Sequence, residues 1–146
     1  RGSQSPLRLC VTSAESDPVH VAFARHFLDL VQVASLVEVQ PGAVHDTMPG
    51  INEGFGCCGL GLVFMDQSGA TFHVDHAALE SLCIFRPAAD VVSDNVMRPG
   101  APLYAWGLVS ARQALTSTFW SLPEFLEESA GVEDWMAVAH VLGDGP

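Results

Sequence analysis

Apolar residues along the first forty positions alternate or recur in patterns that predict two strands and a helix. Residues 7–12 (LRLCVT) alternate apolar and polar side chains and predict a first strand, and residues 36–39 (LVEV) predict a second. Between them, apolar residues recur at helical spacing over residues 19–31. Asp17 is suited to cap this helix, and Pro18 suits its first turn.

The middle of the chain combines a Gly-rich stretch with two β-forming runs. Residues 41–59 contain five Gly and two Pro and predict a long loop. Residues 60–66 and 70–74 predict two strands that Gln67, Ser68 and Gly69 join into a hairpin, with Gly69 at a positive-φ turn position. A short helix is expected over residues 75–82.

The last third is predicted to be mainly helical. Short strands at 84–85 and 91–92 and a stiff turn at 98–102 precede helices over 103–120, from Ser121 onward through a capping box with Glu124, and over 133–142. Together the patterns predict one α+β domain over residues 4–146, with residues 1–3 as a cloning remnant. Its sheet is expected to have four or five mostly antiparallel strands, with helices packed on one face.

Charge restricts the partners that are expected. The chain has no lysine, and its six arginines face seventeen Asp and Glu, which gives a net charge of −11. Such a surface repels nucleic acids and anionic membranes, so neither is an expected partner. A basic protein is the expected partner, and the sequence is also compatible with a homo-oligomer.

Cysteine spacing and hydropathy indicate the compartment. The four cysteines, Cys10, Cys57, Cys58 and Cys83, match neither a zinc pattern nor a disulfide framework. No apolar run reaches the roughly 18 residues of a membrane helix, and no signal-peptide pattern is evident. The expected location is intracellular and cytoplasmic, or the host cytoplasm or nucleus for a viral protein.

Residues 71–76 (TFHVDH) resemble the His-x-His-x-Asp-His signature of the metallo-β-lactamase fold, in which the His and Asp residues bind zinc. Here Thr71 replaces the first His. In a strand, successive side chains point to opposite faces, so His73 and Asp75 are expected to face water. No metal and no cofactor are therefore predicted.

A second candidate site is the pair Cys57 and Cys58, which has glycines on both sides. A thiol nucleophile needs a lowered pKa and an imidazole base, which His73 or His76 would supply across the predicted hairpin. A small thiol-dependent hydrolase is therefore the alternative function, with Asp66 or Asp75 orienting the base.

The favoured function is non-enzymatic binding of another protein through acidic residues near the end of the chain. The proposed binding residues are Glu124, Glu127, Glu128, Glu133 and Asp134.

Two segments resemble the SUKH superfamily of small acidic α+β binding modules. Residues 61–66 and 69–76 are similar to its central hairpin, and residues 121–127 (SLPEFLE) look like its closing helix. That superfamily includes immunity proteins that neutralise toxins and a herpesviral branch that blunts host defence. The resemblance implies an immunity or host-defence antagonist role.

Overall fold

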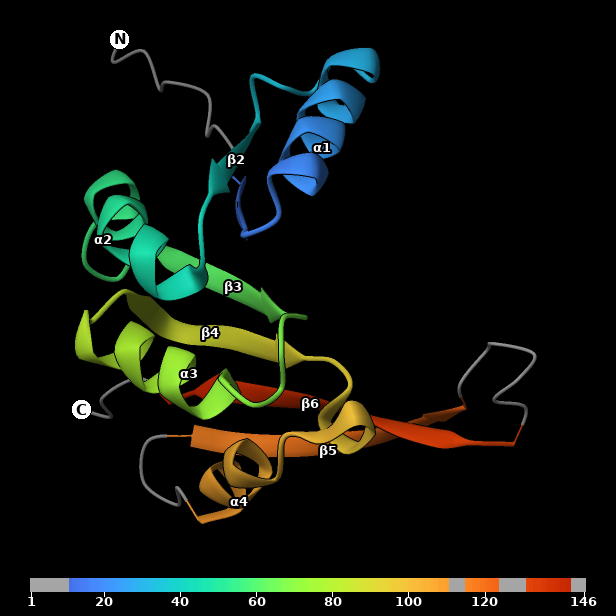
Figure 1. Cartoon of the computed structure of the whole chain (residues 1–146). Helices are drawn as coiled ribbons and strands as arrows, with labels where there is room; N and C mark the ends of the chain where they lie inside the picture. The colour runs from blue at the N-terminus through green and yellow to red at the C-terminus, as the bar shows by residue number, and fades with distance from the viewer. Residues whose placement is uncertain (1–10, 111–114, 124–130, 143–146) are drawn as a thin grey trace, which may run out of the picture. The chain divides into compact units, whose positions relative to one another are not determined.

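The computed structural model describes residues 11–110, 115–123 and 131–142, in which strands and helices mostly alternate (Figure 1). The chain divides into two compact units, residues 1–53 (unit 1) and 54–146 (unit 2). The prediction of a single domain over 4–146 is not tested by this division and stays a prediction. The elements are β1 (Val11–Glu15), α1 (Pro18–Leu30), β2 (Val37–Pro41), α2 (Val44–Phe55), β3 (Leu60–Met65), α3 (Phe72–Ser81), β4 (Phe85–Ser93), the irregular turn η1 (Val96–Gly100), α4 (Pro102–Ser110), β5 (Leu115–Pro123) and β6 (Glu133–Val141).

Unit 1 is built on a parallel pair of strands joined by a helix. β1 and β2 pair in register from Val11 opposite Val37, and α1 provides the crossover that a parallel pair requires. The predicted helix start is confirmed, because Asp17 Oδ1 accepts a hydrogen bond from the backbone N–H of Val19 at 2.7 Å. Arg25 Nη2 fixes the helix to the sheet by donating to the Val39 carbonyl at 2.7 Å.

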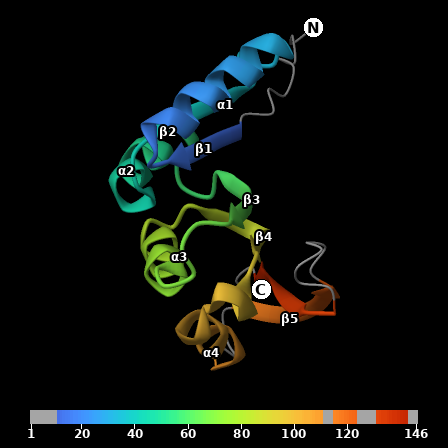
Figure 2. The same ribbon diagram turned by 45° about the vertical axis from the view of Figure 1, so that its right-hand side comes forward.

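Unit 2 contains a mixed four-stranded sheet in the order β3-β4-β6-β5. β3 and β4 are parallel and are connected through α3, whereas β6 is antiparallel to both β4 and β5. The centre of the sheet is fully buried at Val91, Ala137 and Ala139. Figure 2 shows α3 and α4 close together beside this sheet.

The predicted fold class is wrong about the relative direction of neighbouring strands. β1/β2 and β3/β4 are parallel pairs, so the sheets are not mostly antiparallel. The physical reason is the connection between strands: each parallel pair is linked by a helix rather than by a tight turn. Within the described residues, no helix is long and apolar enough to cross a membrane.

The predicted hairpin is the clearest local error. β3 ends at Met65, and residues 72–74 begin α3 instead of a second strand. Gly69 does not have positive φ. A Cβ at this position would lie 2.6 Å from the carbonyl oxygen of Gly100, so glycine is needed for the close approach of two loops. Asp75 is buried in α3, whereas the predicted strand pattern would make it face water.

Four further elements differ from their predictions. Residues 44–55 form α2 within the expected loop, with Met48 and Ile51 buried. The long helix expected over 103–120 stops at Ser110, and β5 follows from Leu115. Ser121 lies in β5 and caps no helix. The last predicted helix is β6, because pairing with strands on both sides outweighs the helical preference of its alanines.

Candidate active site

Two acidic residues leave the sheet side by side where the parallel strands β3 and β4 end. Met65 is paired with Ser93, and the next residues along the two strands are Asp66 and Asp94. The backbone N–H of Asp94 donates to the Met65 carbonyl at 3.0 Å, which continues the pairing past the strand ends. The carboxyl ends of parallel strands are where open α/β folds bind their ligands.

Asn95 follows Asp94 and completes a set of three oxygen-bearing side chains, here named the carboxyl-edge cluster (Asp66, Asp94 and Asn95). Asn95 has a φ of 55°, in the left-handed region that few non-glycine residues adopt. Its backbone N–H donates to Asp94 Oδ1 at 2.8 Å, and its side-chain Nδ2 donates to Asp134 Oδ2 at 2.8 Å. Because the amide nitrogen is engaged, the amide oxygen is left to accept a hydrogen bond or bind a cation.

Asp134, from β6, holds this loop in place. It is 6% exposed and also accepts from the backbone N–H groups of Met97 and Arg98 at 3.1 and 3.0 Å. Burial raises the pKa of Asp134, but hydrogen bonds from Asn95 and from backbone N–H groups outweigh burial and lower it below its usual value. Asp134 was expected on an exposed binding surface and instead supports the carboxyl-edge cluster.

The carboxyl-edge cluster fits a hard divalent cation. Two carboxylates and an amide oxygen are oxygen ligands of the kind that Mg²⁺ and Ca²⁺ prefer, and Mg²⁺ commonly uses only one or two carboxylates plus water or substrate. Within the described ranges, no group of three or more His, Cys, Asp or Glu residues could hold a metal ion. A cation here would therefore depend on the Asn95 oxygen as well as on Asp66 and Asp94.

In unit 1, Glu15 occupies a corresponding place at the end of a parallel strand. It is the last residue of β1, opposite Pro41 of β2. Its Oε1 accepts from the backbone N–H of Asp17 at 2.8 Å, and its Oε2 lies 3.8 Å from His20 Nδ1. Acidic side chains at such strand ends bind ribose hydroxyls in nucleotide-binding α/β folds.

The thiols predicted as nucleophiles lack the required environment. Cys57 and Cys58 are exposed, and their sulfur atoms lie 3.5 Å apart. The hydrogen bond with Cys58 raises the pKa of the Cys57 thiol, which is the opposite of what a thiolate nucleophile needs. His73 and His76 lie on α3 rather than across a hairpin, and no thiol–imidazole hydrogen bond occurs among the described residues.

The predicted acidic binding residues are only partly visible. Glu124, Glu127 and Glu128 lie outside the described residues. Glu133 is exposed on β6, where Ser121 Oγ and Trp135 Nε1 both donate to its Oε1. These two hydrogen bonds lower the pKa of Glu133. A basic protein partner stays a prediction.

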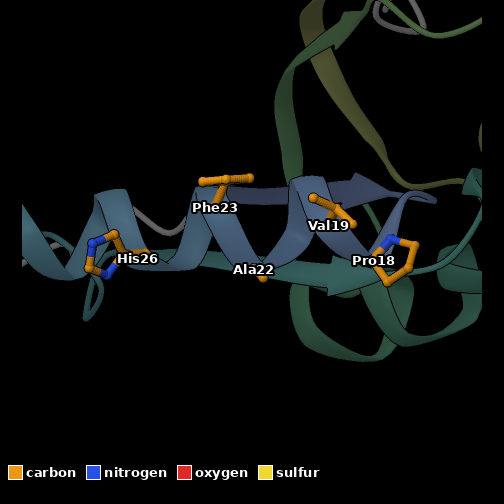
Figure 3. Close-up of a pocket in the computed structure, with 5 residues that line it drawn as sticks. All are labelled: Pro18, Val19, Ala22, Phe23 and His26. Atoms are coloured by element: carbon orange, nitrogen blue, oxygen red, sulfur yellow. The ribbon is translucent and has the colours of Figure 1, made fainter.

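A hollow in unit 1 has no catalytic set among the residues that line it. It measures about 410 Å³ and lies along α1. Figure 3 shows the side chains that line it. His26 is the one titratable residue in a lining that otherwise consists of Pro18, Val19, Ala22 and Phe23.

Among the predicted site residues, Asp66 appears only as a residue that orients a base, and Asp94 and Asn95 do not appear. A signal was present, because the segments 60–65 (LGLVFM) and 91–93 (VVS) are each followed directly by Asp. That signal is informative only once the two runs are known to be neighbouring parallel strands.

Comparison with known proteins finds methyltransferases. Catechol O-methyltransferase B of Danio rerio is 27% identical over 119 residues, which span 82% of this chain and 45% of that protein. Catechol O-methyltransferase of Sus scrofa is 30% identical over 88 residues, which span 60% of this chain and 47% of that protein. The chain thus spans about half the length of the curated relatives it matches. No family model matches the sequence.

Solved structures show the same fold. The O-methyltransferase TomG from Streptomyces achromogenes, in complex with SAM, superposes with a TM-score of 0.74 at 22% identity, covering 92% of this chain and 62% of that one. The O-methyltransferase from Bacillus cereus, in complex with SAH, gives 0.72 at 18% identity, covering 90% and 62%. The chain has the Rossmann-like fold of these methyltransferases, with a mixed sheet.

These findings overturn the SUKH resemblance and the function it implied. The residues that suggested a SUKH hairpin form a strand and a helix, and Ser121–Pro123 are part of a strand. The sequence relatives and the structural neighbours are O-methyltransferases, not immunity proteins or antagonists. The non-enzymatic binding module is therefore a wrong prediction, and the thiol hydrolase is unsupported.

Proposed function

We propose that this chain acts in O-methyl transfer from S-adenosylmethionine, and that the carboxyl-edge cluster holds a divalent cation to which the hydroxyl substrate binds. The observation that carries the proposal is the adjacency of Asp66 and Asp94, with Asn95 directly after Asp94, where two parallel strands end. The similarity to O-methyltransferases supports it. Because the chain spans less than half of the curated relatives, its activity and its substrate are both part of the proposal.

The proposed substrate class is a catechol, an aromatic ring with two adjacent hydroxyl groups. Such a ring suits the carboxyl-edge cluster because a cation held by two carboxylates and one amide oxygen retains positions for further oxygen ligands. A bound cation lowers the pKa of a hydroxyl that coordinates it. The protein's part is to fix the ligand oxygens, and Asp134 does so by orienting Asn95.

The proposed contact with the methyl donor is Glu15. One oxygen of its carboxylate accepts from the Asp17 N–H, and the second oxygen would accept from a ribose hydroxyl. When bound, S-adenosylmethionine supplies the methyl group on its sulfonium sulfur. Glu15 would bind and orient the nucleoside portion.

The test combines binding with turnover. Calorimetry measures the binding of S-adenosylhomocysteine, and transfer of a labelled methyl group to 3,4-dihydroxybenzoate is followed with and without Mg²⁺. We expect Asp66→Asn and Asp94→Asn to abolish Mg²⁺-dependent transfer while leaving S-adenosylhomocysteine binding intact. Asp29→Asn, at an exposed position in α1, makes the same chemical change as a control.

Two results would contradict the proposal. Failure of S-adenosylhomocysteine to bind the unaltered chain would remove the methyl donor. Transfer that persists in a metal chelator would show that the carboxyl-edge cluster holds no required cation.

A further inference from the structure

The turn that leads into β3 presents two thiols to solvent side by side. Side chains of adjacent residues in an extended strand point to opposite faces, which separates neighbouring cysteines. Here Cys58 has a φ of 58°, in the left-handed region, and the Sγ atoms of Cys57 and Cys58 lie 3.5 Å apart. Both side chains are exposed. We name residues 56–59 the dithiol turn; it precedes β3, whereas the carboxyl-edge cluster begins after this strand, so the two share no residue.

The backbone fixes the shape of the dithiol turn. The Cys58 N–H donates to the Cys83 carbonyl at 2.9 Å, and the Gly59 N–H donates to the Gly56 carbonyl at 3.2 Å. Gly56 has a φ of 74°, and a Cβ on Gly59 would overlap the Phe55 carbonyl. A left-handed non-glycine residue such as Cys58 persists where its surroundings hold it. The two thiols are therefore positioned as a pair before any ligand binds.

Two thiols without a further ligand restrict what the pair can bind. Thiolates favour soft, thiophilic centres. Zn²⁺ in a structural site takes four ligands. In the part of the chain that the structure describes, no group of three or more His, Cys, Asp or Glu could hold a metal ion. Trivalent arsenic that carries one organic group has two remaining valences, and two sulfur atoms fill both.

The protonation of the pair favours the same ligand. The hydrogen bond with Cys58, together with the charge of a Cys58 thiolate, raises the pKa of the Cys57 thiol, so this thiol keeps its proton near pH 7. A metal ion would have to displace that proton into solution. An organoarsenic oxide instead carries an oxygen that leaves as water with the two thiol protons. Because such an oxide is uncharged, the net charge of −11 does not oppose its approach.

We propose that the dithiol turn binds trivalent organoarsenicals, with one arsenic atom bridging Cys57 Sγ and Cys58 Sγ. Two As–S bonds form, the bonds between arsenic and its oxide oxygen break, and that oxygen leaves as water with the two thiol protons. Arsenic stays trivalent, so no oxidant or reductant is needed. The second thiol reacts within the same molecule, so the pair binds about hundredfold or more tightly than a single thiol, as for other bivalent ligands.

The test uses phenylarsine oxide and the fully reduced chain, with excess glutathione as a competing single thiol. Mass spectrometry of the intact protein should show one phenylarsenic group per chain, gained with the loss of two thiol protons. Cys57→Ser and Cys58→Ser should each lower the affinity by about hundredfold or more, because glutathione then competes with one remaining thiol of the pair. Cys83→Ser removes an exposed thiol outside the pair and should bind like the unaltered chain.

Two further readouts need no variant. The small dithiol 2,3-dimercaptopropanol should release the phenylarsenic group, whereas glutathione should not. The affinity should be equal at about pH 6 and about pH 7.5, because the reaction releases no proton into solution, unlike the binding of a metal cation. Tight binding that persists in both Cys57→Ser and Cys58→Ser would overturn the proposal. So would equal losses in Cys57→Ser and Cys83→Ser, because the arsenic would then be bound by thiols other than this pair.

Discussion

Asp134 is the residue on which the geometry of the carboxyl-edge cluster most depends. Its carboxylate accepts from Asn95 Nδ2 and from the N–H groups of Met97, Arg98 and Trp135. One buried side chain on β6 thereby fixes the loop that follows β4. The left-handed conformation of Asn95 is sustained by these contacts.

We predict that Asp134→Asn destabilises the protein by about 1.5–3 kcal/mol, the usual worth of hydrogen bonds to a charged group. The amide keeps the shape of the side chain but replaces an acceptor oxygen with a donor that faces other donors. Urea unfolding measures the change, and Asp29→Asn, the same chemical change at an exposed position of α1, serves as control. Equal midpoints for the two variants would show that the loop does not depend on this carboxylate.

The lowered pKa of Asp134 also predicts how stability depends on pH. Because the folded pKa lies below the unfolded value of about 3.9, the contribution is fully present above that value and is lost as pH falls through the folded pKa. We therefore expect the free energy of unfolding to fall on acidification below about pH 4, and to fall less steeply in Asp134→Asn. Unfolding curves across an acidic pH series measure both slopes. Parallel slopes would contradict the assignment.

Gly69 brings the loop after β3 against the loop after β4. A Cβ there would lie 2.6 Å from the Gly100 carbonyl oxygen, which is backbone and cannot swing away. We expect Gly69→Ala to destabilise by about 1–3 kcal/mol through overpacking. Gly54→Ala is the matched control, because nothing lies within 4 Å of its added Cβ. Thermal unfolding compares the two, and an unchanged melting temperature in Gly69→Ala would argue against the close approach.

At the scale of elements, the sequence predicted those whose signals are local. The Asp17–Pro18 start of α1 is encoded within a few residues, and so is the apolar run of β3. Residues 75–82 were recognised as helical, although α3 begins three residues earlier, at Phe72. These elements could be predicted because caps and periodicity act over short distances along the chain.

The missed elements depend on contacts between distant residues. The segment 133–141 contains good helix formers, but Ala137 pairs with Ser93 and Phe119, far away in sequence, and this pairing makes it a strand. The carboxyl-edge cluster was missed for the same reason, since the adjacency of Asp66 and Asp94 follows from the pairing of β3 with β4. α2 was not predicted, because its Gly and Pro residues are typical of a loop, although Met48 and Ile51 are buried.

The β5–β6 pair offers a test of this strand assignment. Phe119 on β5 and Trp135 on β6 meet edge to face, with ring centroids 6.2 Å apart. We predict a coupling energy of about 0.5–1.5 kcal/mol between Phe119→Leu and Trp135→Leu in a double-mutant cycle of urea unfolding. Strictly additive effects would show that the rings do not contact each other.

At the scale of the whole molecule, a charge of −11 complicates any claim of specific cation binding. Divalent cations screen the mutual repulsion of acidic groups wherever these lie, and this alone stabilises an acidic protein. A specific site must therefore be distinguished from general screening. The distinction is available because Asp94→Asn and Asp29→Asn each change the net charge by the same single unit, from −11 to −10.

We predict that Mg²⁺ raises the melting temperature of the unaltered chain and of Asp29→Asn by the same amount. In Asp94→Asn, we expect Mg²⁺ to raise the melting temperature only as much as NaCl of equal ionic strength does, which is a smaller rise. The physical reason is linkage: a ligand at about 100 times its Kd stabilises the folded state by about 2.7 kcal/mol, provided that the unfolded chain does not bind it. Asp94 supplies one of the two carboxylates at the carboxyl edge, whereas Asp29 lies on an exposed part of α1. Thermal unfolding over an Mg²⁺ series, with ionic strength matched by NaCl, measures the difference. If all three proteins respond alike, the cations act by screening, and the carboxyl-edge cluster is not a cation site.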